Sequence, residues 1–199
     1  NGAGKTTLLR ILNQEIDFQS GSVEIEGRRG AIIDLTSGFN IERSGRENIY
    51  IKGNLLGYDQ KQLKQFEERI VDFAELGDFT DRAIKTYSSG MLLRLAFSIS
   101  INLPVDVLLI DEILAVGDFY FQQKCLARVN AIREHVCIIM ASHSTETIQT
   151  FCDAAMVLDH GRVIYYGDPK KASEIYFGQI QHKKERQVSS IFEEQLVEA

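Results

Sequence analysis

Seven residues at the start of the chain have the types and spacing of a phosphate-binding loop. They are Asn1, Gly2, Ala3, Gly4, Lys5, Thr6 and Thr7, and apolar residues at helical spacing follow them. In the pattern G-x-x-x-x-G-K-[ST], glycines let backbone N–H groups turn toward phosphate oxygens at a helix N-terminus. Lys5 would then reach the outer phosphates and the Thr6 hydroxyl would bind Mg²⁺. The alternative is a Gly-Lys-Thr sequence in an ordinary surface loop, which the helical pattern behind it disfavours.

A second group of reactive side chains is predicted at the ends of buried strands. The apolar run Val107–Ile110 ends in Asp111 and Glu112, and ligands bind at the carboxyl ends of parallel strands. Asp111 could orient Mg²⁺ and its water, while Glu112, facing the other way, could polarise an attacking water. His143 follows the apolar run 136–140 and is expected at the same sheet edge. The alternatives are a solvated strand end for the two acids and a structural role for the histidine.

A further anion-binding site is predicted at another helix start. Ser88, Ser89 and Gly90 open a helical pattern that continues to about Asn102. The N–H groups of a helix N-terminus attract anions for the same reason as those of the first loop. The alternative is a serine that acts only as a helix N-cap.

Strand and helix signals alternate along the chain, and this order predicts an α/β fold with a parallel sheet wrapped by helices. These elements must position the residues named above. Strands are expected at 22–26, 31–35, 107–110 and 136–140, with a hairpin of strands 154–159 and 162–166 around the turn His160-Gly161. Helices are expected at 4–14, 45–57, 59–74, 118–133 and about 169–178, with Asp59 as an N-cap, and a further helix opens within 87–91 and runs to about 102. The block from 45 to about 86 has no strand signal and is predicted to be an inserted helical subdomain. From residue 179 the chain is polar and charged, as expected of a linker or solvated helix.

Composition limits the classes of function. The 199 residues fit one large domain, or one domain and a tail, and the net charge of −6 disfavours nucleic acid as the main partner. No run of 18 apolar residues is present, so no segment is expected to span a membrane. Three cysteines without metal-binding spacing are expected to be free thiols. Because the first glycine of the phosphate-binding motif should precede Asn1, we expect the chain to be part of a longer protein.

The order of these motifs resembles that of the ATP-binding-cassette (ABC) ATPases, which have a P-loop NTPase fold. Gly4–Thr7 match the Walker A loop, and Ser88–Gly90 stand at the position of the L-S-G-G-Q signature. Asp111-Glu112 match the Walker B motif with its catalytic glutamate. Further along the chain, Ala115–Asp118 look like the D-loop and His143 matches the switch histidine. The resemblance covers residues 1–178, which are expected to form an ABC-type ATP-binding domain, with 179–199 as a charged tail.

Three segments resemble one branch of this family, the ATPase subunits of bacterial surface-polysaccharide exporters. They are 44–49, 87–91 and 112–118. Those subunits serve the export of capsule, O-antigen or wall teichoic acid. The resemblance implies a peripheral subunit on the cytoplasmic face of the cytoplasmic membrane, present in two copies and docked on a separate permease.

The chain departs from the family pattern at two places. No glutamine stands near residues 34–35, where the family has its Q-loop, and Asp34 is the nearest polar residue that could help to bind Mg²⁺. The signature has Ser89 in place of its first glycine and Met91 in place of its glutamine. The second departure affects side-chain contacts but not the backbone N–H groups of Ser88–Gly90.

The mechanism that the resemblance implies is metal-assisted phosphoryl transfer from ATP to water. Lys5, the loop amides and Mg²⁺ would neutralise phosphate charge, Glu112 would polarise the water, and His143 would contact the γ-phosphate. Ser88 and Gly90 would act at the ATP of the partner copy, and Ser89 and the D-loop residue Asp118 are expected to help to bind nucleotide.

Two other functions fit the motifs less well. A soluble ABC ATPase without a permease would be expected to carry two cassettes and basic patches for RNA, unlike this acidic single cassette. A non-enzymatic nucleotide-binding regulator would not need Asp111, Glu112 and His143 together.

Overall fold

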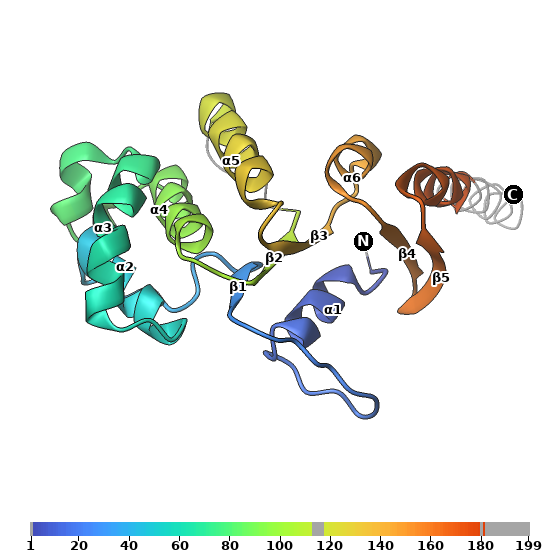
Figure 1. Ribbon diagram of the computed structural model, residues 1–199. Helices are drawn as coiled ribbons and strands as arrows, with labels where there is room; N and C mark the ends of the chain where they lie inside the picture. The colour runs from blue at the N-terminus through green and yellow to red at the C-terminus, as the bar shows by residue number, and fades with distance from the viewer. Residues whose placement is uncertain (1, 113–117, 180, 182–199) are drawn as a thin grey trace, which may run out of the picture. The chain divides into compact units, whose positions relative to one another are not determined.

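The computed structural model describes residues 2–112, 118–179 and 181 (Figure 1). The expected nucleotide contact of Asn1, the D-loop residues 115–117 and most of the expected tail lie outside these residues. The chain divides into two compact units, which are described separately. The larger unit comprises Thr6–Ala141, and the smaller unit comprises the described parts of Asn1–Lys5 and Ser142–Ala199. The boundaries of the ATP-binding domain stay a prediction.

A parallel three-stranded sheet forms the centre of the larger unit. Its order is β1 (Arg29–Ile32), β2 (Val107–Asp111) and β3 (Cys137–Ala141). Ile32 pairs with Ile110, and Asp111 pairs with Ala141, so the three strands end at one edge. In β2, Leu108, Leu109 and Ile110 are buried between the two neighbouring strands, as a parallel strand requires, and Val107 is half-buried. The predicted α/β fold with a parallel sheet is confirmed.

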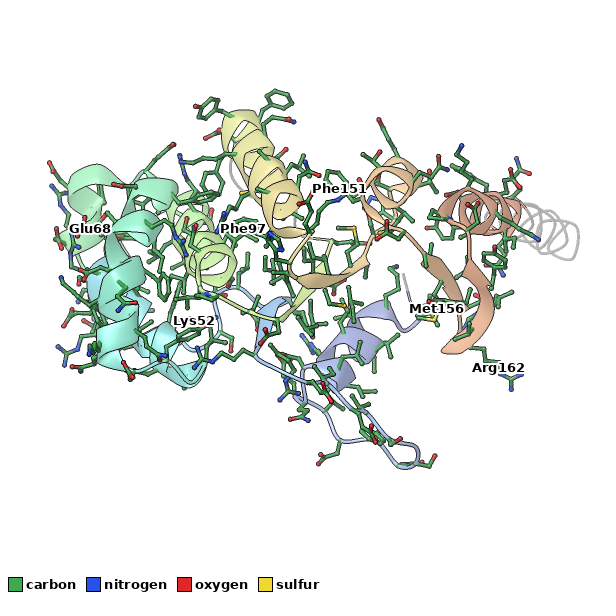
Figure 2. The ribbon with its side chains drawn as sticks, viewed as in Figure 1. Lys52, Glu68, Phe97, Phe151, Met156 and Arg162 are labelled. Atoms are coloured by element: carbon green, nitrogen blue, oxygen red, sulfur yellow. The ribbon has the colours of Figure 1, made fainter. Side chains whose placement is uncertain are left out.

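Helices pack on this sheet through an aromatic core. Helix α4 (Ser89–Asn102) contributes Phe97, and α5 (Phe119–Ile132) contributes Phe121; both side chains are fully buried. Their ring centroids lie 6.3 Å apart in an edge-to-face arrangement. Figure 2 labels Phe97 within this core. The contact fixes α4 and α5 against each other beside the sheet.

The helical insertion, residues 45–86, precedes α4 and shares a second apolar core with it. It contains α2 (Gly45–Leu55), α3 (Gln60–Ala74) and the short 3₁₀ helices η1 (Gly77–Asp81) and η2 (Ile84–Thr86). Ser44 caps α2 and Asp59 caps α3, each in a reciprocal capping box, so the predicted Asp59 cap is confirmed. Leu63 and Ile70 of α3 are fully buried in this core.

Three sequence predictions about strands need correction. Residues 22–26 do not form a strand: Val23 and Ile25 are half-buried as their alternation predicts, but no neighbouring strand pairs with them among the described residues. Strand β1 begins at Arg29, two residues before the prediction, because the backbone N–H of Asp106 donates to Arg28 O over 2.8 Å and starts the pairing early. Strand β3 is only half-buried, with Cys137 exposed, whereas a buried strand was expected.

The smaller unit contains the predicted hairpin. Strands β4 (Ala155–Asp159) and β5 (Arg162–Gly167) pair antiparallel, and both turn residues have positive φ, 47° at His160 and 76° at Gly161. Positive φ at both central residues is the requirement of a type I′ turn. Helix α6 (Thr145–Phe151) precedes the hairpin, and residues 169–179 form a helix capped by Asp168.

Candidate active site

Two side chains predicted to bind a metal ion meet in the larger unit. Helix α1 (Lys5–Leu12) carries Thr6 in its first turn, and β2 ends at Asp111. The Thr6 hydroxyl donates a hydrogen bond to Asp111 Oδ2 over 2.5 Å. A hydroxyl and a carboxylate oxygen are the hard ligands that Mg²⁺ prefers, usually completed by waters and substrate phosphates. The residues present therefore fit this ion.

The loop before α1 has the backbone conformation that its glycines predict. Gly2 has a φ of 87° and Gly4 a φ of 99°, a region that residues with a Cβ rarely adopt. Between them, Ala3 O accepts a hydrogen bond of 2.9 Å from the N–H of Gly161 in the β4–β5 turn. Lys5 follows and is half-buried, while Thr6 and Thr7 are exposed. The contact with Gly161 was not predicted, because nothing local in the sequence links two turns so far apart.

Glu112 follows β2 in a left-handed conformation, with a φ of 49°. Its N–H donates to Ala141 O over 2.9 Å, so the pairing of β2 with β3 continues through this residue. A non-glycine residue held at positive φ costs of order 1–3 kcal/mol, and such strain is found mainly at functional sites. The side chain is exposed, as a residue that acts on solvent water must be.

Asp34 lies two residues beyond β1, on the edge of the sheet where Asp111 also lies. Its side chain is exposed, and the chain turns back there through a hydrogen bond from Ser37 N to Asp34 O. The loop is held by Lys52 of α2, whose Nζ donates to Leu35 O over 3.1 Å and to Ser37 O over 2.6 Å. Figure 2 labels Lys52. Burial lowers the pKa of Lys52, and the negative charge of Asp34 opposes that shift. Lys52 was not predicted from the sequence, because its partners are backbone carbonyls on another element.

His143 belongs to the smaller unit, two residues after the end of β3 in the chain. It is exposed and directly precedes α6, which Ser144 caps by accepting a hydrogen bond from Thr147 N over 3.3 Å. Its role at the γ-phosphate stays a prediction.

The second predicted anion site lies at the start of α4. The Ser88 side chain caps the helix by accepting from Met91 N over 3.2 Å, and Ser88 and Ser89 are exposed. A cap of this kind satisfies one N–H, and the remaining first-turn N–H groups have no acceptor within the helix. The N-cap and an anion site are therefore compatible at this position.

Asp118 stands at the N-terminus of α5. Its Oδ1 accepts from Phe121 N over 2.9 Å, and this hydrogen bond lowers the pKa of the carboxyl. Its Oδ2 lies 3.6 Å from an Nη atom of Arg94, a residue of α4. The carboxylate thus connects the start of α5 to the helix that begins with Ser88–Gly90.

Comparison with known proteins identifies the family of this site. A family model described as ABC transporter matches residues 1–115, more than half of the chain. The chain belongs to the ABC transporter family. None of the helices in the described ranges is both long enough and apolar enough to cross a bilayer.

Three relatives within this family carry transport-related names. The chain is 45% identical over 177 residues to the ABC transporter protein AbcA of Aeromonas salmonicida, covering 88% of this chain and 58% of that protein. It is 40% identical to the O-antigen export system ATP-binding protein RfbB of Klebsiella pneumoniae, with 88% and 72% coverage. It is 40% identical to the teichoic acids export ATP-binding protein TagH of Bacillus anthracis, with 88% and 32% coverage. The chain therefore spans between 32% and 72% of the length of these relatives.

A solved structure confirms the fold. The ATP-binding cassette MJ0796, a dimer bound to ADP and Pi in a post-hydrolysis state, has a TM-score of 0.69 with 15% sequence identity. The similarity covers 84% of this chain and 81% of that one. The fold is thus the P-loop NTPase fold of an ABC ATPase domain.

Proposed function

We propose that this ABC transporter chain hydrolyses ATP and powers the export of a surface polysaccharide or teichoic acid. One observation carries the proposal: the hydroxyl of Thr6, directly behind the phosphate-binding loop, bonds the carboxylate of Asp111 at the tip of β2. This pair is the arrangement in which an NTPase binds a nucleotide-associated metal ion. The names of RfbB and TagH, at 40% identity, support the substrate class.

The phosphates of ATP would be bound by the loop and the start of α1. Left-handed Gly2 and Gly4 allow N–H groups to face phosphate oxygens, and Lys5 adds a positive charge. Mg²⁺, held by Thr6 and Asp111 with Asp34 at the same edge, would neutralise charge on the transferred phosphoryl group. This is electrostatic stabilisation, which supplies most of the catalysis in phosphoryl transfer.

Water would be activated beside this site. Glu112 is held in its left-handed conformation by the hydrogen bond to Ala141 O, and its exposed carboxylate would orient and polarise the attacking water. His143 would hold the γ-phosphate from the segment that follows β3. Each residue acts from the end of a different element, as expected of a site at the carboxyl edge of a parallel sheet.

A second copy of the chain would complete each site. The exposed residues Ser88 and Ser89, with Gly90, would present the first-turn N–H groups of α4 to the ATP of the partner copy, and Asp118 would lie at the same interface. The copies would dock on a membrane permease at the cytoplasmic face of the membrane, where closing and opening of the dimer would drive transport.

The experiment separates cells into membrane and soluble fractions and purifies the full-length protein from each fraction. Proteins that co-purify are identified, and phosphate release from ATP is measured alongside, with a Lys5→Ala variant as the control. We expect an integral-membrane permease in the complex and an ATPase activity that the Lys5→Ala variant lacks. An active ATPase found only in the soluble fraction, without a permease, would contradict the transport function and favour a soluble ABC ATPase.

A further inference from the structure

The end of α3 has a conformation that its residue type does not favour. Glu75 is the C-cap, with a φ of 53° and a ψ of 43°, and its N–H donates to Val71 O over 3.2 Å. Left-handed C-terminal positions of helices are usually occupied by glycine or asparagine, because other residues suffer a clash at Cβ. A glutamate at this position suggests that its side chain has a separate role.

The Glu75 carboxylate bridges two cations from two other helices. Its Oε2 lies 2.6 Å from an Nη atom of Arg94 in α4, and its Oε1 lies 2.5 Å from Lys124 Nζ in α5. Lys124 Nζ also donates to Phe73 O over 3.1 Å. One carboxylate at the end of the helical insertion therefore connects α3 with both α4 and α5 through charge-assisted hydrogen bonds.

Arg94 extends this connection to the candidate active site. Its second Nη atom lies 3.6 Å from Asp118 Oδ2, and its guanidinium stacks 4.6 Å from the centre of the Phe121 ring. Arg94 lies less than two turns from Ser88–Gly90, and Asp118 opens α5. The helical insertion is thus connected to the starts of α4 and α5, the two helix starts that the proposed mechanism uses. The connection consists of Glu75, Arg94, Lys124 and Asp118.

We propose that Glu75 is a positioning residue for ATP hydrolysis. By holding Arg94 and Lys124, it sets the orientation of the helix starts at Ser88–Gly90 and at Asp118. The inference rests on the proposed function, because the helix starts at Ser88–Gly90 and at Asp118 contribute to a reaction only if the protein hydrolyses ATP. Without the carboxylate, two cations would face each other across the junction of three helices, and their repulsion would move α4 and α5 apart.

The test replaces Glu75 by a residue that suits the backbone but lacks the charge. Asparagine adopts the left-handed conformation readily, so in the full-length Glu75→Asn protein the relief of backbone strain should offset the loss of the two ion pairs and keep the thermal unfolding midpoint close to that of the wild type. We expect kcat for ATP hydrolysis to fall about tenfold while KM changes less than about twofold, because only the alignment of catalytic groups is lost. The matched control is Glu42→Gln, which breaks an ion pair of 2.6 Å with Lys85 near the same insertion and should leave kcat unchanged.

A double-mutant cycle tests whether Glu75 affects kcat through Arg94. Asp118→Asn keeps a good N-cap but loses the charge that faces Arg94. Because Glu75 and Asp118 both act on Arg94, the combined loss of kcat in the Glu75→Asn/Asp118→Asn protein should be smaller than the product of the single losses. Three results would each overturn the inference. The first is a wild-type kcat in Glu75→Asn, and the second is a kcat loss that accompanies a drop in thermal stability. The third is a combined kcat loss in the double mutant that equals the product of the single losses. An inactive wild-type protein would instead overturn the proposed function.

Discussion

The Thr6 hydroxyl and the Asp111 carboxylate lie 2.5 Å apart, although 105 positions separate them in the chain. The hydroxyl comes from the first turn of α1, and the carboxylate comes from the carboxyl end of β2. Only a fold that places the helix start against the tip of this strand brings the two oxygens together. Both atoms are ligands suited to Mg²⁺, so this pair is the centre of the proposed mechanism.

Replacing Thr6 by valine should weaken binding of Mg-ATP more than binding of ATP without metal. Valine keeps the branched shape and removes the hydroxyl that bonds Asp111, and disturbing a metal site typically costs about 10- to 100-fold in affinity. Titration calorimetry with and without Mg²⁺ measures both affinities. Thr6→Ser, which retains the hydroxyl, is the control and should behave like the wild type. An unchanged Mg²⁺ dependence in Thr6→Val would remove Thr6 from the metal site.

Replacing Gly90 by aspartate should stop hydrolysis while leaving ATP binding by the single subunit intact. A Cβ at this position would meet only Ser88 Oγ, at 3.9 Å, so the fold can accept a side chain there. The loss would come from repulsion between the new carboxylate and the phosphates of the partner copy's ATP. Gly90→Asn has nearly the same size without the charge, and we expect it to retain most activity. If Gly90→Asp abolished ATP binding by the monomer, the two-copy site would be wrong.

Local signals in the sequence were sufficient for the helix starts and for the motifs. Asp59 and Ser88 cap their helices as their residue types predict, because capping involves only a few neighbouring residues. The errors concern contacts between distant segments. The start of β1 depends on Arg28 and Asp106, and the alternation at 22–26 says nothing about whether a partner strand is present.

Contacts between distant residues also explain why sequence reasoning missed two charged residues that connect elements of the structure. Lys52 binds backbone carbonyls of the loop after β1, and Glu75 bridges α4 and α5. Neither residue has a motif, and each resembles an ordinary charged residue on a helical pattern. Glu67 is buried on the same face of α3 as Leu63 and Ile70, a position where helical periodicity favours an apolar residue.

Stability at low pH should depend on Glu67. Burial alone would raise its pKa, but hydrogen bonds from Lys64, Tyr50 and Arg46 outweigh burial and lower the pKa from 4.5 to about 2. Because the folded pKa lies below the unfolded one, the stabilisation is complete above about pH 4.5 and is lost as the pH falls toward 2. At pH 7 we expect Glu67→Gln to reduce the free energy of unfolding by about 3 kcal/mol.

Urea unfolding of the wild type and Glu67→Gln between pH 2 and pH 7 measures this effect. The difference in unfolding free energy should shrink steadily below about pH 4.5. The adjacent Glu68→Gln is the control: its side chain is 74% exposed, and loss of its ion pair with Arg46 should change stability by less than about 1 kcal/mol. A difference between wild type and Glu67→Gln that does not vary with pH would show that the ion pairs of Glu67 contribute nothing.

The central claim is that this site hydrolyses ATP with Glu112 as the residue that activates water. The most direct measurement compares Glu112→Gln with the wild-type protein for ATP affinity, phosphate release and self-association in the presence of Mg-ATP. We predict unchanged ATP affinity, a loss of turnover on the order of 10²- to 10⁴-fold, and a dimer that persists only while ATP is bound. Glu112→Gln protein that releases phosphate at the wild-type rate would contradict the account.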